Sequence, residues 1–217
     1  MSKTGGKPLM REKSVRTLVL YGMFVAIVFL LGLTPLGYIY LPMAAITTVH
    51  IPVIVGGYTL GKKGGAVLGF FFGLTSFIKC FTTPDAIAAI MLGTSTGFGA
   101  YNLLLIIAVL FLPRILTGFF SAALYEFIGG TGKRQAAAMG ISAFVGTMTN
   151  TVLFLGGLYV LAFEQAAEAM GVAGSALLTT LLGIVASNGI IEAIAAVIIC
   201  TAVGKAISAY ADRNKSE

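Results

Sequence analysis

Four side chains that can bind or carry charge lie within long apolar stretches of the sequence: Arg114, Asn150, Asn188 and Glu192. A charge at the centre of a membrane-spanning helix costs about 2.5–3.5 kcal/mol on insertion scales, so it requires a partner or a wet cavity. An arginine can hold a carboxylate through two parallel hydrogen bonds. These residue types therefore predict either a pocket for a small anionic molecule or an internal ion pair.

The spacing of these residues places them at a similar depth. With a helical rise of about 1.5 Å per residue, Arg114 lies roughly 16 Å, and Asn150 and Asn188 roughly 18 Å, from the outer ends of their predicted spans. Glu192 follows Asn188 by four residues and shares its helical face. Two compatible interpretations remain open: an outward-opening pocket, and an Arg114–Glu192 ion pair that locks two helices together. For Asn150, an interhelical hydrogen bond is a further alternative.

The composition indicates a membrane protein. The chain has 217 residues, of which 58% are hydrophobic and 10% charged, and its mean hydropathy is +0.98. A soluble domain carries about 25% charged residues. Apolar runs of about 20 residues recur along the chain, and they are continuous rather than alternating as in a β-barrel. We therefore predict an all-α integral membrane protein that contacts lipid.

Turn signals divide the apolar sequence into six predicted spans. The polar turn at residues 61–64 joins two apolar stretches into a helical hairpin, and Pro113 interrupts the fourth span because proline removes a backbone hydrogen bond. A short helix is predicted at residues 84–92. The six spans are predicted at residues 15–33, 48–60, 64–78, 103–128, 135–162 and 176–206.

The basic residues set the predicted orientation. An even number of spans leaves both termini on one side, and placing that side in the cytoplasm leaves only Lys79 and Arg114 of the 14 Lys and Arg elsewhere. The net charge of +6 is thus explained by membrane topology and does not indicate a nucleic-acid partner. We predict a multi-pass plasma membrane protein built from a basic cytoplasmic tail, a six-helix membrane domain and a polar cytoplasmic tail, at residues 1–14, 15–207 and 208–217.

The segment before the predicted hairpin carries further polar candidates. The loop at residues 35–46 contains two prolines and two tyrosines, including Tyr40, so we expect it to fold back over the membrane face as a cap. His50 follows at the outer end of the second span. A satisfied polar residue is the favoured interpretation of His50, and ligand contact is the alternative. No second ligand residue lies at helical spacing from it, so no metal site is predicted.

Small residues recur four positions apart in two spans. They are Gly22 and Ala26 in the first span and Gly65, Gly69 and Gly73 in the third. This spacing makes a smooth helical face that a neighbouring backbone can approach closely. Internal packing is the simpler interpretation of each set, and a docking face for a membrane partner is the alternative.

Two common enzyme motifs are not found in the sequence. It contains no G-x-x-x-x-G-K-[ST] and no H-E-x-x-H. We therefore predict that this chain is not an enzyme, does not hydrolyse ATP and needs no cofactor of its own.

Several stretches resemble the substrate-specific S component of energy-coupling factor (ECF) vitamin transporters. The resemblance extends over about residues 15–207, and the chain is most similar to the pantothenate-type S components. It is carried by residues 46–57 and 73–77 of the predicted hairpin, residues 112–118, Asn150-Thr151 and residues 188–192.

This resemblance implies a six-helix membrane fold that binds one vitamin from outside. The first loop with Tyr40, the third loop and the last three spans would enclose the ligand, with pantothenate as the first candidate and riboflavin, folate or another vitamin as alternatives. It also implies a complex with a membrane T component and two cytoplasmic ATPases, which use the ATP. The family's Ala-x-x-x-Ala contact with the T component corresponds to Gly22 and Ala26, and it differs at the first position.

An autonomous ion-coupled secondary transporter is the alternative function. Glu192 would then be the proton carrier, because it is an acidic residue within a span. The two halves of the sequence show no repeat of the kind that relates the halves of many secondary transporters. Dependence on partner ATPases or on a proton gradient would separate the two functions.

Overall fold

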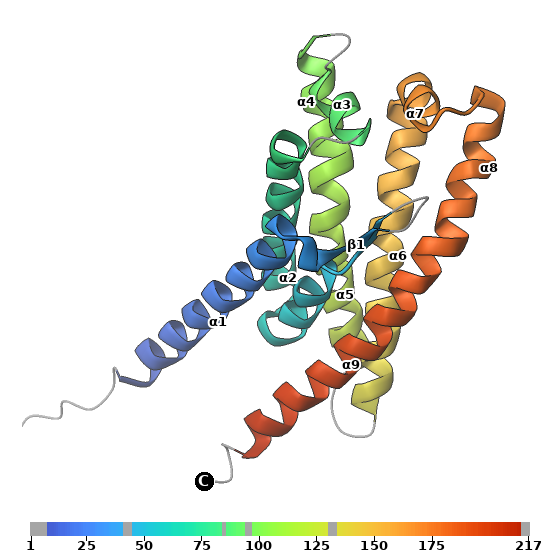
Figure 1. Cartoon of the computed structure of the whole chain (residues 1–217). Coiled ribbons are helices and arrows are strands. Elements are labelled where there is room, and N and C mark those ends of the chain that lie inside the picture. Colours follow the sequence, from blue (N-terminus) through green and yellow to red (C-terminus); the bar gives the residue numbers. More distant parts are fainter. Residues whose placement is uncertain (1–7, 41–44, 84–85, 94–96, 130–133, 214–217) are drawn as a thin grey trace, which may run out of the picture.

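The computed structural model describes residues 8–40, 45–83, 86–93, 97–129 and 134–213. Within these residues the chain is almost entirely helical, and five helices are long and apolar enough to cross a membrane. Figure 1 shows them as one bundle. The prediction of an all-α integral membrane protein is therefore confirmed. The five helices are Val15–Leu33, His50–Thr82, Ala100–Ile128, Gln135–Leu161 and Gly174–Tyr210.

These spans consist of shorter elements, because two of them change from α- to π-helical geometry and back. The third span is α4, η2 and α5, and the last is α8, η4 and α9. The bounds are α1 Pro8–Leu33, η1 Pro35–Gly37, β1 Tyr38–Tyr40, β2 Ala45–Thr47, α2 His50–Thr82, α3 Ala86–Leu92, α4 Ala100–Leu105, η2 Ile106–Phe111, α5 Leu112–Ile128, α6 Gln135–Leu161, α7 Phe163–Met170, α8 Gly174–Ile184, η4 Val185–Gly189 and α9 Ile190–Arg213.

The longest described helix, α2, consists of two arms that meet at Gly61. Gly61 has φ 75° and ψ −179°, a conformation that glycine tolerates and that lies outside the helical region. Leu68 packs against Gly56, although a continuous helix would separate these residues by about 18 Å. The chain therefore reverses direction at the predicted turn, and the predicted second and third spans are the two arms of α2.

Glu126 of α5 fastens this reversal. Its Oε1 accepts a hydrogen bond of 3.1 Å from the Lys62 backbone N–H, and its Oε2 lies 3.8 Å from Lys62 Nζ. The first backbone N–H groups of a helix have no partner within the helix, so a carboxylate there satisfies one of them. Its negative charge is also attracted by the positive end of the helix dipole. The second arm thus receives its N-terminal cap from a different helix.

The glycines of the second arm pack against α5. A Cβ on Gly65 would collide with the Gly118 carbonyl, one on Gly69 with the Arg114 carbonyl, and one on Gly73 would lie 2.9 Å from the Phe111 ring. All three glycines are buried; α5 covers Gly65 and Gly69, and Phe111 of η2 covers Gly73. Their assignment to a partner interface is therefore corrected: they allow close internal packing.

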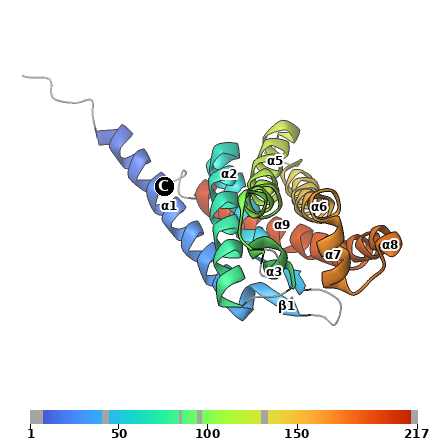
Figure 2. The ribbon, with the colours of Figure 1, turned by 90° about the horizontal axis from the view of Figure 1, so that it is seen from above.

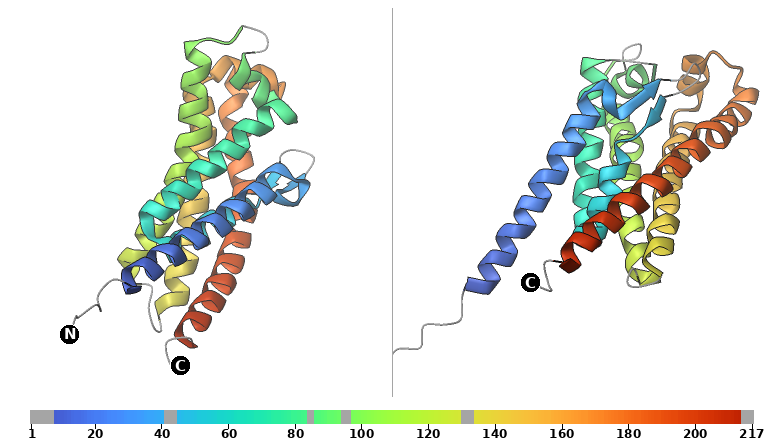
Figure 3. Two further views of the ribbon diagram at one scale, coloured as in Figure 1. Left: turned by 90° about the vertical axis from the view of Figure 1, so that its left-hand side faces the viewer. Right: turned by 60° about the horizontal axis from the view of Figure 1, so that its bottom comes forward.

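A two-stranded hairpin follows α1. Strands β1 and β2 are antiparallel, with Tyr38 opposite Thr47 and Tyr40 opposite Ala45. The Thr48 N–H donates a hydrogen bond of 2.9 Å to the Gly37 carbonyl. Figures 1 and 3 show the hairpin running from the end of α1 toward the helix formed by α8, η4 and α9. The predicted cap at residues 35–46 is thus a hairpin, of which residues 41–44 lie outside the described residues.

The apolar core has two parts. One includes Met91 of α3, Leu158 of α6 and Leu177 of α8, and the other includes Val28 of α1 and Phe72 of α2. Figure 2 shows α3 and α7 lying over one end of the bundle and α1 along its edge beside α2. A short helix was predicted at residues 84–92, and α3 occupies most of that range.

The ends of several elements differ from the predicted ones. Helix α1 begins at Pro8, within the predicted N-terminal tail, and α9 continues to Arg213, within the predicted C-terminal tail. Both extensions are helical because no proline or glycine stops the helix at the point where the apolar sequence gives way to polar residues. The connection after α6 contains the amphipathic helix α7.

We predict that Gly65→Ala lowers the free energy of unfolding in detergent by about 1–3 kcal/mol, because the new methyl group collides with the α5 backbone. The measurement is thermal unfolding of the purified protein. Gly22→Ala is the matched control: a Cβ there meets nothing within 4 Å, so its stability should be unchanged or slightly higher. Equal stability of the two variants would contradict the packing described here.

Candidate ligand-binding site

Arg114 is fixed by the backbone irregularity that precedes it. Pro113 has no N–H, so the Val109 carbonyl, four residues earlier, lacks its usual helical donor. Arg114 Nη1 donates a hydrogen bond of 2.7 Å to that carbonyl. Val109 itself lies in the π-helical segment η2. The predicted interruption at Pro113 is therefore preceded by a π-helical segment. The Val109 carbonyl of this segment, which lost its helical donor at Pro113, orients the arginine.

The Arg114 guanidinium lies between the two parts of the apolar core. Its Cζ is 4.4 Å from the centre of the Phe154 ring on α6 and 5.6 Å from that of Phe72 on α2. Aromatic rings at these distances attract a cation, and more strongly where water is excluded. Only 8% of Arg114 is exposed. The charge is thus held in the interior among α2, α5 and α6.

Arg114 and Glu192 make hydrogen bonds to different parts of the protein. Glu192 Oε1 accepts a hydrogen bond of 2.5 Å from the Thr47 backbone N–H of strand β2, whereas Arg114 binds the Val109 carbonyl. The opposite charges still attract each other electrostatically. Strand β2 engages the carboxylate, and the Arg114–Glu192 ion pair stays a prediction.

Helix α6 brings Asn150 beside this arginine and also faces η4. Asn150 lies one helical turn before Phe154, so it shares the face that Arg114 covers. Its neighbour Thr151 packs against Gly189, where a Cβ would lie 3.1 Å from the threonine side chain. Asn188 is the residue next to that glycine and lies within the π-helical segment η4. The structure therefore brings together the three spans that carry Arg114, Asn150 and Asn188, which were predicted from the helical rise to lie at a similar depth.

The chain segment after β2 adds His50 to this region. His50 begins α2, three residues after the Thr47 that binds Glu192, and it is only 1% exposed. The Thr47 backbone lies close to its ring, yet neither ring nitrogen makes a hydrogen bond of normal geometry with a described residue. Both interpretations of His50, as a satisfied polar residue and as a ligand contact, therefore stay predictions. Tyr40 lies in β1, and its side chain is outside what the structure describes.

Several buried polar atoms in this region lack hydrogen-bond partners within the described residues. Such an atom costs about 1–3 kcal/mol when it is removed from water, so native proteins leave few of them. A ligand or an ordered water molecule is the usual explanation. The atoms are His50 Nδ1 and Nε2, Thr147 Oγ1, Asn150 Oδ1 and Asn188 Nδ2. We call these four residues the polar cluster.

Two features of the cluster were not predicted from the sequence. Thr147 was overlooked, although it precedes Asn150 by three residues and therefore lies on the same helical face. The two π-helical segments were also missed; such segments often occur at functional sites. Gly189, which ends η4, was a sequence signal for the close approach of another helix.

The predicted partner residues of α1 are exposed. Gly22 and Ala26 lie one turn apart on an outward face of α1, and a Cβ on Gly22 would meet no neighbouring atom within 4 Å. This face differs from the buried glycines of α2, because no described part of the chain covers it. Its role at a partner interface stays a prediction.

A helical membrane protein with polar groups collected between its spans belongs to the class that binds or transports solutes across membranes. Comparison with known families identifies the member of that class. A family model described as "ECF transporter, substrate-specific component" matches residues 16–204, and the chain belongs to this family. It is a multi-pass plasma membrane protein and a transport component, not an enzyme.

Two relatives give a narrower likeness. The chain is 36% identical over 174 residues to the pantothenic acid transporter PanT of Lactococcus lactis subsp. cremoris, covering 75% of this chain and 77% of that protein. It is 28% identical over 217 residues to the pantothenate transporter PanT of Leuconostoc mesenteroides, covering 94% and 98%. The resemblance to the S component family is therefore confirmed over nearly the whole chain.

We predict that Asn150→Leu keeps or raises the stability of the ligand-free protein, by up to about 1–3 kcal/mol, because it removes a buried carbonyl oxygen that lacks a partner. Thermal unfolding in detergent measures this. Asn102→Leu is the control, since buried Asn102 binds the Gly99 N–H and the Ile90 carbonyl at 3.1 and 3.2 Å; it should destabilise. Equal destabilisation by both would instead favour the interhelical hydrogen bond considered for Asn150.

Proposed function

We propose that this chain is the vitamin-binding subunit of an ECF importer and that its ligand is pantothenate. The observation that carries the proposal is the buried Arg114 guanidinium beside a polar cluster whose hydrogen-bonding atoms await partners. Two relatives named for pantothenate transport support the choice of vitamin.

The carboxylate of pantothenate suits Arg114. The Val109 carbonyl engages one nitrogen of the guanidinium, and the other N–H groups of an arginine fork match the two oxygens of a carboxylate. In a site shielded from water, the attraction between these charges is stronger than in bulk solvent.

The remainder of pantothenate offers hydroxyl and amide groups, which suit the polar cluster. Each asparagine presents one donor group and one acceptor, a neutral histidine presents one of each, and a threonine hydroxyl serves as both. Asn150, Asn188, His50 and Thr147 could therefore bind a ligand that carries donors as well as acceptors. An apolar vitamin body would leave them unsatisfied.

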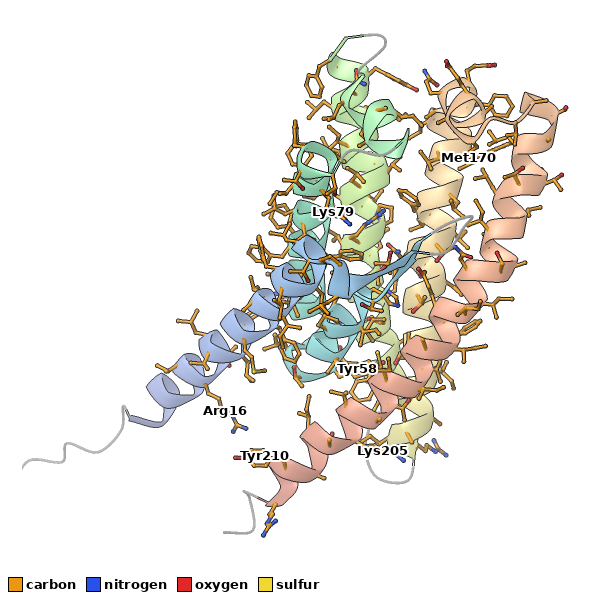
Figure 4. The ribbon with its side chains drawn as sticks, in the orientation of Figure 1. Arg16, Tyr58, Lys79, Met170, Lys205 and Tyr210 are labelled. Atoms are coloured by element: carbon orange, nitrogen blue, oxygen red, sulfur yellow. The ribbon has the colours of Figure 1, made fainter. Side chains whose placement is uncertain are left out.

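We further propose six membrane crossings with both termini in the cytoplasm. The reversal at Gly61 supports an even number of crossings, because it divides α2 into two arms that run in opposite directions and returns the chain to the side where α2 began. The positive charges support the orientation. Figure 4 shows Arg16 and Lys205 toward one end of the molecule and Met170 toward the other, with Lys79 on the half nearer Met170.

The chain would work with a membrane T component and two cytoplasmic ATPases, which supply ATP hydrolysis. Membership in the ECF family supports these partners in general. The outward face of α1 with Gly22 and Ala26 is the surface we assign to the T component, because small residues let another helix approach closely.

Binding of pantothenate and of pantothenol, its analogue with an alcohol in place of the carboxylate, tests the ligand assignment. We predict that Arg114→Gln weakens pantothenate roughly 10–100-fold, as expected for losing a charge-assisted hydrogen bond, and changes pantothenol little. Asn150→Leu should weaken both ligands alike. Isothermal titration of the purified protein measures this, with mass spectrometry of any copurified small molecule.

Two results would contradict this assignment. Equal weakening of both ligands by Arg114→Gln would show that the arginine acts only on the fold. An absence of tight binding to pantothenate, riboflavin, folate, thiamine and biotin in the unmodified protein would reject the vitamin-binding function altogether.

The assignment of the α1 face predicts a separate phenotype. Ala26→Trp should leave pantothenate affinity unchanged and should prevent copurification with the T component, because a large side chain blocks close helix packing. Ala26→Ser provides the control at the same position, because it keeps the side chain small and should copurify normally. Unimpaired copurification of the Ala26 variant would assign the partner surface elsewhere.

A further inference from the structure

One hydrogen bond joins the hairpin to the last span. The Thr47 N–H of β2 donates to Glu192 Oε1 at 2.5 Å, across 145 positions of sequence. Glu192 is 7% exposed and lies in the first turn of α9. This carboxylate is therefore an interior group with a specific partner in the hairpin.

The geometry of the hairpin explains why Thr47 needs that partner. Successive N–H groups of a strand point to opposite sides, and the next residue, Thr48, donates to the Gly37 carbonyl on the β1 side. The Thr47 N–H consequently points away from β1, at the open edge of a two-stranded sheet. An unpaired N–H is costly within a membrane, where water is scarce. Glu192 satisfies it.

The same hydrogen bond places the hairpin across the polar cluster. On one side of it, Thr47 precedes His50 by three residues; on the other, Glu192 follows Asn188 by one helical turn. Strand β2 contacts both η4 and α9. Figure 3 shows the hairpin reaching from the α1 side of the bundle to this last span. Separating Glu192 from Thr47 would therefore release the hairpin from one wall of the cluster.

We propose that Glu192 is a positioning residue that holds the hairpin over the bound vitamin and slows its dissociation. This rests on the proposed function. Glu192 then acts through the Thr47 backbone and does not contact the ligand, which fits the charge of the ligand: a carboxylate bound at Arg114 would be repelled by a second carboxylate. The role differs from direct substrate binding and from proton transport, because it requires an acceptor oxygen and no charge.

Two substitutions separate these roles. Glu192→Gln keeps a carbonyl oxygen at the same position and removes the charge, whereas Glu192→Ala removes the acceptor. We expect dissociation of radiolabelled pantothenate to be roughly tenfold faster in Glu192→Ala, the effect of losing one such hydrogen bond. In Glu192→Gln it should stay within about twofold of the unmodified protein. Equal acceleration in both variants would overturn the proposal in favour of a role for the charge.

A second measurement does not depend on any ligand. Amide hydrogen exchange of residues 45–48 in the ligand-free protein should be roughly tenfold faster in Glu192→Ala and unchanged in Glu192→Gln, while exchange in α6 stays constant as a control for folding. Unchanged exchange in Glu192→Ala would overturn the proposal. If no variant binds pantothenate and this contrast persists, the proposed function fails and the link between Glu192 and the hairpin stands.

The donor can be removed independently. Thr47→Pro deletes the N–H at an edge position where proline is tolerated, and Thr47→Ala keeps it. The proline variant should reproduce the exchange and dissociation of Glu192→Ala, and the alanine variant those of the unmodified protein. Equal behaviour of the proline and alanine variants would overturn the assignment of Thr47 as the partner.

Discussion

The scarcity of water within a membrane governs the whole structure. Every polar group there must find a partner inside the protein, and the local solutions follow from that need. The carbonyl that Pro113 leaves without a donor receives Arg114, and the second arm of α2 begins at a carboxylate from α5. Against this background, the buried atoms of His50, Thr147, Asn150 and Asn188 differ, because they have no hydrogen-bond partner among the described residues.

Arg114 also lies between two apolar regions. Arg114 contacts Phe72, which belongs to one part of the core, and Phe154, which packs against the other. Neither region is interrupted elsewhere by a buried cation among the described residues. The bundle thus consists of two apolar parts with a buried cation between them. The charge lies deep in the protein, and the packing within each apolar part continues without interruption.

Much of this arrangement was accessible from the sequence because membrane spans obey simple rules. The helical rise predicted a similar depth for Arg114, Asn150 and Asn188, and the polar composition of residues 61–64 predicted the turn at Gly61. The β hairpin was not predicted, since two strands of three residues leave little pattern in an apolar loop. The face used by Gly65 was ambiguous because glycine spacing shows that a backbone approaches closely but does not identify whose backbone it is. That the His50 ring nitrogens lack hydrogen-bond partners among the described residues could be recognised only from three-dimensional contacts.

The reversal at Gly61 also determines how far the site lies from one surface of the protein. The first arm of α2 runs from His50 to the turn at Gly61, and at about 1.5 Å per residue it is only roughly 16 Å long, about half the hydrocarbon thickness of a bilayer. One end of this short arm borders the polar cluster, and the other bears the lysine pair. A molecule bound beside His50 would therefore be separated from the lysine-bearing face by the length of this short arm.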